Sequence, residues 1–316
     1  MKKVLAVLLC ALLIFSLSAC GGKKDDAKSS EKTTVSEEPK FIDVTEDTDA
    51  MNLHFTPPAG YDSVERVSGK DVKGNITEKS FNYTFADNSS VMVGYTVGKE
   101  LTDSVPQKSL EKATAATYAG KQFKVIEEGS AFVALCEEGD VIYGIGYSFA
   151  KKADGNKAKF EDFMSKISFT DATETQTDDD DLFGITYDAK AAGNMTSEQI
   201  TVTKKAGGTL IQKAVSWHYG KDEKNLDYRF LIRVYKNTTV DAQKTTGNEY
   251  EEKVINGITY AVRKMSNGEK PCEYFTQHGK DVYKIYNHGV ASGWGVDRSE
   301  QSQTAFEAFV NSVKFA

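Results

Sequence analysis

The chain of 316 residues carries 46 Asp and Glu against 39 Lys and Arg, which gives a formal net charge of −7 at pH 7. Binding to nucleic acid usually requires a basic face, and no block of Lys and Arg in this sequence would form one. The acidic balance also argues against adhesion to anionic lipid headgroups. With 40% hydrophobic residues, the chain is able to build one hydrophobic core or two.

The first segment has the parts of a secretory signal peptide. Two lysines precede an apolar run over residues 4–17, and small residues then lead directly into Cys20. Residues 17–20 (LSAC) form a lipobox and resemble the signals of bacterial lipoproteins. The resemblance implies a signal peptide over residues 1–19 and lipidation of Cys20, with palmitate as an acyl chain. The alternative is an uncut membrane helix, for which the run is short, because a span needs about 20 apolar residues.

Lipidation of Cys20 makes the membrane the first expected partner, since two or more acyl chains hold a protein stably to a bilayer. We therefore expect the extracytoplasmic face of a bacterial cell membrane, and a Gram-positive host. Residues 20–50 are expected to form the lipidated cysteine and a flexible tether, because few large apolar residues occur there. A short strand over residues 41–44 is the alternative for those four residues. The tether would hold the next domain roughly 30 Å from the membrane.

A second polar stretch, residues 171–181, separates two segments of similar size, 51–170 and 182–316. Its four consecutive aspartates lack the spaced ligands, the central glycine and the distant glutamate of an EF-hand loop. We therefore predict an acidic, solvated linker between two domains.

The two segments share the order of their features, which predicts a tandem repeat. Apolar residues recur at i, i+3, i+4 and i+7 near both ends, as on one face of an amphipathic helix. Strand-like alternation recurs further upstream in both. The matching pairs are 160–169 with 306–315, 139–145 with 279–285, and 76–83 with 210–217.

Each segment is also predicted to contain a middle helix, over residues 107–119 and 241–253. The first of these has Pro106 in its opening turn and Gly120 after its last turn. Turns rich in Asn, Asp and Gly between the strands imply antiparallel pairing. The predicted fold class is α+β, with two tandem repeats that each consist of an antiparallel sheet flanked by helices.

This order of elements is similar to that of the PsbP-like superfamily. Residues 55–61 form an aromatic strand followed by a Pro/Gly turn, and Gly120 and Gly257 precede the middle strands. The resemblance implies PsbP-like domain 1 over 51–170 and PsbP-like domain 2 over 182–316. It implies a binding or accessory protein, although a fold analogy does not by itself establish function.

The sequence predicts no catalytic residue, no metal site and no cofactor site. Residues 146–150 depart from a nucleophile elbow, because they end in alanine and no helix directly follows. Cys136 and Cys272 lack a neighbouring histidine that would activate a thiol, and we predict two buried thiols, with a disulfide as the alternative. The four histidines do not have the spacing of metal ligands: His54, His218, His278 and His288.

Aromatic side chains are the remaining signal, with 15 Tyr, 17 Phe and 2 Trp. Rings offer a large contact area together with a polar group, and extracytoplasmic proteins use them to bind sugars and peptides. The candidate ligand-binding residues are Trp294, Trp217 and Tyr274. Trp294 lies between two glycines before the last helix, whereas the alignment of Trp217 with Tyr83 favours a core position.

The sequence thus predicts a membrane-anchored extracytoplasmic lipoprotein of a non-enzymatic binding or accessory type. Its expected partner is an unknown envelope protein or a small ligand, and not nucleic acid. Two alternatives stay open at this point. One is an envelope hydrolase with an unrecognised site, and the other is a structural spacer or assembly factor for exported proteins.

Overall fold

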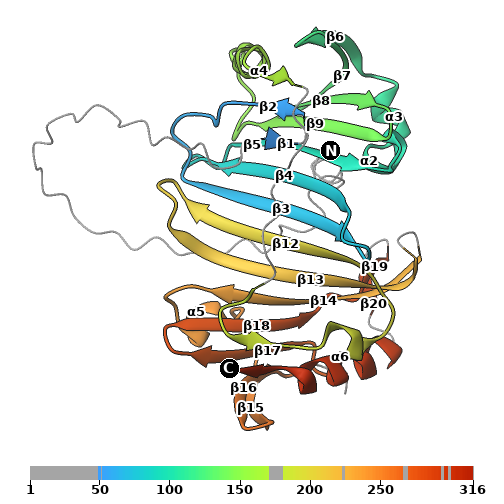
Figure 1. Cartoon of the computed structure of the whole chain (residues 1–316). Helices are drawn as coiled ribbons and strands as arrows, with labels where there is room; N and C mark the ends of the chain where they lie inside the picture. Colours follow the sequence, from blue (N-terminus) through green and yellow to red (C-terminus); the bar gives the residue numbers. More distant parts are fainter. Residues whose placement is uncertain are drawn as a thin grey trace, which may run out of the picture.

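A single antiparallel sheet of 14 strands forms the body of the molecule and runs from β6 at the top of Figure 1 to β15 at the bottom. The computed structural model describes residues 49–50, 52–170, 181–222, 225–265, 270–292, 295–297 and 300–315. The strands of the sheet, in spatial order, are β15 (Tyr250–Ile255), β16 (Ile258–Arg263), β17 (Glu273–His278), β18 (Asp281–Asn287), β14 (Asn225–Tyr235), β13 (Leu210–Asp222), β12 (Met195–Lys205), β3 (Ser63–Asp71), β4 (Ile76–Thr84), β5 (Ser90–Val97), β9 (Val141–Ser148), β8 (Ala131–Glu138), β7 (Lys121–Glu128) and β6 (Thr114–Tyr118).

Helices and short strands lie around this sheet. Among the described residues, no helix combines the length and the apolar character that a membrane crossing requires. The helical segments are α2 (Leu101–Ser104), α3 (Gln107–Leu110), α4 (Asn156–Met164), η1 (Ala189–Ala192), α5 (Val240–Gln243) and α6 (Glu300–Ser312), and the short strands are β1 (Asp49–Ala50), β2 (Leu53–His54), β10 (Ser168–Phe169), β11 (Ile185–Thr186), β19 (Val290–Ser292), β20 (Gly295–Asp297) and β21 (Lys314–Phe315).

The predicted α+β class, with helices flanking the sheets of two repeats, is wrong. The chain is mostly β and its main sheet is continuous. The two expected middle helices are one source of the error. Residues 107–119 contain only the single turn α3 before β6, and residues 241–253 contain the end of α5 and the start of β15. Pairing of β6 with β7 and of β15 with β16 outweighs the weak local preference for helix.

The two halves of the sheet repeat one succession of strands. From the centre outward the order is β3-β4-β5-β9-β8-β7-β6 on one side and β12-β13-β14-β18-β17-β16-β15 on the other. The halves join through β3 and β12, which pair along their whole length with Val67 opposite Thr201 at the midpoint. Val67 pairs with Ser80, and Thr201 pairs with Ala214, so the two central residues occupy matching places. We call this β3–β12 pair the seam; an approximate twofold axis passes through it.

One face of the sheet, the core face, packs against α4 in the first half and α6 in the second. In the first half, Phe160 of α4 stacks on Phe132 with the ring centroids 5.2 Å apart. In the second half, Phe309 of α6 lies against Phe230 at 5.7 Å. All four rings are buried. Alternation along the strands directs one aromatic or β-branched residue after another to this face, and the phenylalanines of each helix complete the core.

The opposite face is concave. Lys99 follows β5, yet its positive charge helps to lower the pKa of His218 on β13. Likewise the charge of Glu78 on β4 acts on Arg229 on β14. Both pairs are separated by four strand spacings, about 19 Å in a flat sheet. The long side chains on this face of the twisted sheet therefore reach toward one another over the intervening strands.

Candidate functional site: matching pockets on the concave face

A pocket of about 480 Å³ opens on the concave face at the β15 end of the sheet. We call it the aromatic pocket. Its walls come from α5 and the residues beside it, from the edge strand β15, and from β16 and β17. The lining residues are Thr239, Val240, Asp241, Lys244, Tyr250, Glu251, Glu252, Thr259, Ala261, Phe275, Thr276 and Gln277.

Two rings form the floor of the aromatic pocket. Phe275 is fully buried, and the ring of Tyr250 lies against it at 5.9 Å and 64°. Ala261 is the residue opposite Phe275 in the neighbouring strand β16. Because alanine carries only a methyl group, it leaves space above the Phe275 ring that a larger side chain would fill.

A polar network beside the floor, on the same face of the sheet, fixes the position of Tyr250. The Tyr250 hydroxyl donates to Glu273 Oε2 at 3.0 Å, and the Glu273 carboxylate forms an ion pair with Lys284. Glu273 is only 2% exposed, so this charge is neutralised inside the protein. Lys284 Nζ in turn lies 5.3 Å from the centroid of the Phe275 ring. Burial is the main cause that raises the pKa of Tyr250 above its usual value. The backbone N–H of Thr245 lowers this pKa, and the charge of Glu273 raises it.

The rim on the α5 side is tied to the same tyrosine. Lys244 Nζ lies 2.8 Å from Asp241 Oδ1 and 5.4 Å from the centroid of the Tyr250 ring. The backbone N–H of Thr245 donates to the Tyr250 hydroxyl at 3.2 Å. The Thr239 side chain accepts from the backbone N–H of Ala242 and caps the start of α5. Tyr250 therefore connects the floor of the pocket to its rim.

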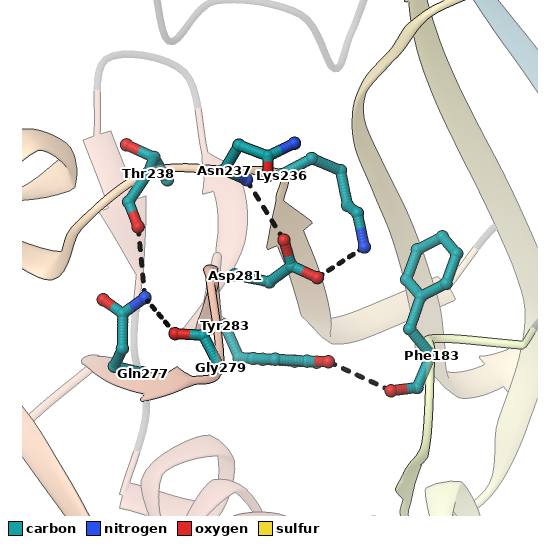
Figure 2. Close-up of polar contacts among 8 residues, drawn as sticks. All are labelled: Phe183, Lys236, Asn237, Thr238, Gln277, Gly279, Asp281 and Tyr283. Atoms are coloured by element: carbon teal, nitrogen blue, oxygen red, sulfur yellow. Dashed lines mark hydrogen bonds and ion pairs between the residues drawn. The ribbon is translucent and has the colours of Figure 1, made fainter.

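A third set of contacts, drawn in Figure 2, holds the segment before α5 against the β17–β18 hairpin. Gln277 Nε2 donates to the carbonyl oxygen of Thr238 at 3.1 Å. Asp281 accepts from the backbone N–H of Asn237 at 3.1 Å and forms an ion pair with Lys236. These contacts fix the wall of the pocket without a ligand, so the pocket is preformed.

The charge of the aromatic pocket is negative. Its lining residues include Asp241, Glu251 and Glu252 against the single lysine Lys244. Asp241 is paired with Lys244. Glu251 faces the core side of the sheet, where its charge acts on Tyr274, whereas Glu252 has neither a hydrogen bond nor an ion pair within the described parts of the chain. One uncompensated carboxylate, that of Glu252, thus borders the opening.

The first half has a pocket of about 360 Å³ at the matching place, which we call the twin pocket. Lys124 on β7 faces Leu135 on β8, just as Ala261 faces Phe275 in the second half. Helix α2 follows β5 as α5 follows β14. The twin pocket also has three carboxylates and one lysine, but leucines replace the rings; its lining is Glu100, Leu101, Thr102, Gln107, Leu110, Glu111, Lys124 and Glu137.

The residues singled out in the sequence lie elsewhere. Trp217 and Tyr274 are each 1% exposed and point into the core face. The indole N–H of Trp217 donates to Glu198 Oε2 at 3.0 Å. Neither ring therefore lines either pocket. Trp294 and Cys20 fall outside the residues that the structure describes.

Sequence reasoning missed Tyr250 and Glu252 because residues 241–253 were assigned to a helix. An Asn-Gly turn after residues 250–255 is the signal that indicates a hairpin there. The sequence prediction of Tyr274 as a ligand-binding residue missed the pocket by one position, because its neighbour Phe275 is at the floor of the pocket. Successive residues of a strand point to opposite faces, so only one of the two can reach the concave face.

The concave face also brings a serine and a histidine together. Ser197 Oγ lies 2.9 Å from His218 Nδ1. Burial, reinforced by the positive charges of Arg229 and Lys99, lowers the pKa of His218 to about 3. A general base works best with a pKa near the operating pH, so this imidazole is a weak base at pH 7. Cys136 and Cys272 are buried free thiols, and no group of three or more potential metal ligands occurs in the described parts of the chain.

Comparisons with known proteins give little further guidance. No family model and no curated protein matches the chain. Among solved structures, the chain is similar to MucB in complex with MucA(peri), with 7% identity over 80% of this chain and 93% of that chain and a TM-score of 0.16. The MucA/MucB complex of Pseudomonas aeruginosa gives 8% identity over 80% and 93%, also with a TM-score of 0.16. A TM-score this low carries no argument about fold or function.

Proposed function

We propose that the protein is a non-enzymatic binding lipoprotein on the extracytoplasmic face of a bacterial cell membrane. The observation that carries the proposal is the presence of a preformed pocket at matching places in both halves of the sheet. Ligand sites are typically concave, largely preformed and between 300 and 1,000 Å³ in volume, and both pockets fall in this range. The aromatic pocket, with its buried ring floor, is the principal site.

The lipobox supports the proposed location. A lipid on Cys20 would fix the chain to the membrane, and residues 20–50 would let the pockets reach a partner in the envelope. The pocket itself supports binding rather than group transfer, because Tyr250, Glu273 and Lys284 are committed to contacts with one another. The groups that remain open to a partner are the exposed part of the Tyr250 ring and the carboxylate of Glu252.

Site-specific photo-crosslinking in the full-length protein, in membranes of its host, tests the proposal. A photoreactive residue at Thr259, which is exposed and lines the aromatic pocket, should give a discrete adduct. The matched control is Glu127, which is exposed on β7 and lines neither pocket. Absence of an adduct at Thr259, or the same adducts from both positions, would contradict a binding role for the pocket.

The anchor is tested in the same membranes. Cys20→Ala should abolish incorporation of labelled palmitate and release the protein from lipid attachment. Cys10→Ala is the matched control, because Cys10 belongs to the expected signal peptide and its loss should leave labelling unchanged. Retained labelling in Cys20→Ala would show that the lipid is not on this residue.

A further inference from the structure

We propose that the aromatic pocket binds a cationic side chain, the lysine or arginine of a partner polypeptide. This inference rests on the proposed binding function and adds the chemical class of the ligand. It combines three features of the pocket: aromatic rings that already attract lysines, the uncompensated carboxylate of Glu252, and the apolar surface of Ala261 and Tyr250.

The rings of the floor already attract cations within the protein. Lys244 Nζ lies 5.4 Å from the centroid of the Tyr250 ring, and Lys284 Nζ lies 5.3 Å from that of Phe275. Both distances are within the range of about 6 Å in which the negative face of an aromatic ring attracts a cation. The surroundings of these two rings are thus suited to positive charge.

The internal lysines do not neutralise the pocket. Lys244 is paired with Asp241, and Lys284 is paired with the buried Glu273. Glu252 is left over at the edge of the opening. An incoming cation therefore finds a carboxylate without a partner at the rim, whereas an anionic group would be repelled. The interaction is stronger in a partly enclosed pocket than in bulk water, because the effective dielectric constant is lower there.

The shape of the pocket fits a long side chain with a charged end. Lysine and arginine bury their methylene stems against apolar surface and keep the charged group at the wet end. In the aromatic pocket the stem would lie along Ala261 and the half-buried Tyr250 ring, and the charged group would reach Glu252 at the rim. A small inorganic cation would leave this apolar floor unused.

The twin pocket supports the inference independently. It shares little sequence with the aromatic pocket, yet it also has three carboxylates against one lysine. Lys124 and Glu137 are paired at 3.8 Å, which leaves Glu100 and Glu111 in excess. The sign of the charge is thus the same at both ends of the sheet. Because Leu101 and Leu110 replace the rings, we expect the twin pocket to bind the same cation more weakly.

The test is an NMR titration of the full-length chain in detergent with three short peptides. Each peptide has glycines around one central residue, which is lysine, arginine or the neutral norleucine. Lysine and arginine peptides should shift the Tyr250 ring resonances, with an affinity that falls as salt is added, whereas the norleucine peptide should bind more weakly. No shift with either cationic peptide, or equal binding of norleucine, would overturn the inference.

Variants assign the effect to the pocket. Glu252→Gln should lower the affinity for the lysine peptide about two- to five-fold, as expected for a partly exposed ion pair. Tyr250→Leu, followed through the Phe275 ring resonances because the Tyr250 probe is gone, should lower it by a similar factor through loss of the ring. Glu127→Gln removes one exposed carboxylate far from the pocket and should change nothing. Equal effects of Glu252→Gln and Glu127→Gln would mean that only the net charge of the protein matters.

The crosslinking experiment separates the two proposals. An adduct at Thr259 together with no binding of cationic peptides would leave the binding function in place and overturn the choice of ligand. Failure of both the adduct and the peptide titration would overturn the binding function itself.

Discussion

At the scale of single residues, matching positions in the two halves can differ in residue type. The turns at the two ends of the sheet are an example. Ala119 joins β6 to β7 with φ of 48°, and Asn256 joins β15 to β16 with φ of 51°. Each is followed by a glycine that also has positive φ. An L-residue in this left-handed region costs roughly 1–2 kcal/mol, and asparagine tolerates it better than alanine.

Ala119→Asn should therefore raise the free energy of unfolding by about 0.5–1 kcal/mol. The reverse change at the matching place, Asn256→Ala, should lower it by at least as much, since Asn256 Nδ2 also donates to the carbonyl oxygen of Asn311 at 2.7 Å. Urea denaturation at pH 7 measures both. Equal stability of Ala119→Asn and the parent would show that the turn is not strained.

A second residue-scale prediction concerns the buried His218. Its native pKa is about 3, below the value of about 6.5 in the unfolded chain. The unfolded state therefore takes up a proton as the pH falls through 6.5, while the native state does not. The free energy of unfolding should fall by roughly 2 kcal/mol between pH 7 and pH 5 through this residue alone. Urea titrations at the two pH values measure the difference.

The variants His218→Gln and His54→Gln identify the source of this pH dependence. His218→Gln should lose most of the difference between pH 7 and pH 5, whatever its stability at pH 7. His54→Gln, a matched change at a half-buried histidine on β2, should keep the difference. An unchanged pH dependence in His218→Gln would mean that the imidazole is protonated in the folded protein.

At the scale of elements, alternation of apolar residues was a sound guide and local propensity was not. The alternating segments 76–83 and 210–217 predict strands, and the structure has β4 and β13 there. The helical periodicity at 160–169 and 306–315 is likewise borne out in part by the end of α4 and by α6. The prediction of a helix over the Ala-, Lys- and Glu-rich stretch 107–119 was wrong, because the stability gained by pairing with a neighbouring strand is not encoded in local composition.

Two glycines on adjacent strands give a prediction about sheet packing. A Cβ on Gly94 of β5 would lie 2.5 Å from the carbonyl oxygen of Lys79 and 2.9 Å from Ser80 Cα, both backbone atoms of β4. A Cβ on Gly146 of β9 would meet only the flexible Met92 side chain, at 3.7 Å. Gly94 is thus required by a close approach of two backbones, and Gly146 is not.

Gly94→Ala should accordingly lower the free energy of unfolding by about 1–3 kcal/mol, because β4 and β5 must move apart. Gly146→Ala should be neutral or stabilising by up to about 1 kcal/mol, since glycine within a strand has an entropic cost. Denaturant titration of the two variants side by side gives the comparison. Equal effects would show that β4 can shift freely.

At the scale of the whole molecule, the sequence predicted a repeat but not the way in which the two copies join. Each copy alone would end in β3 or β12 as an open edge strand with unpaired backbone groups, which proteins avoid exposing. Pairing β3 with β12 removes both edges at once. No local pattern in residues 63–71 indicates this partner, since Thr201 is far from Val67 in sequence and the register follows from the symmetry of the two halves.

The seam makes a final prediction about cooperativity. Because backbone hydrogen bonds continue from one half to the other through nine paired residues, we expect the two halves to unfold in one transition. Phe160 and Phe306 hold matching positions in α4 and α6 and are 1% and 0% exposed. Phe160→Ala and Phe306→Ala should each cost about 3–5 kcal/mol, and each should lower the midpoint of the same single transition in calorimetry. Two separate transitions, each shifted by only one of the variants, would show instead that the halves are independent units and that the seam contributes little to stability.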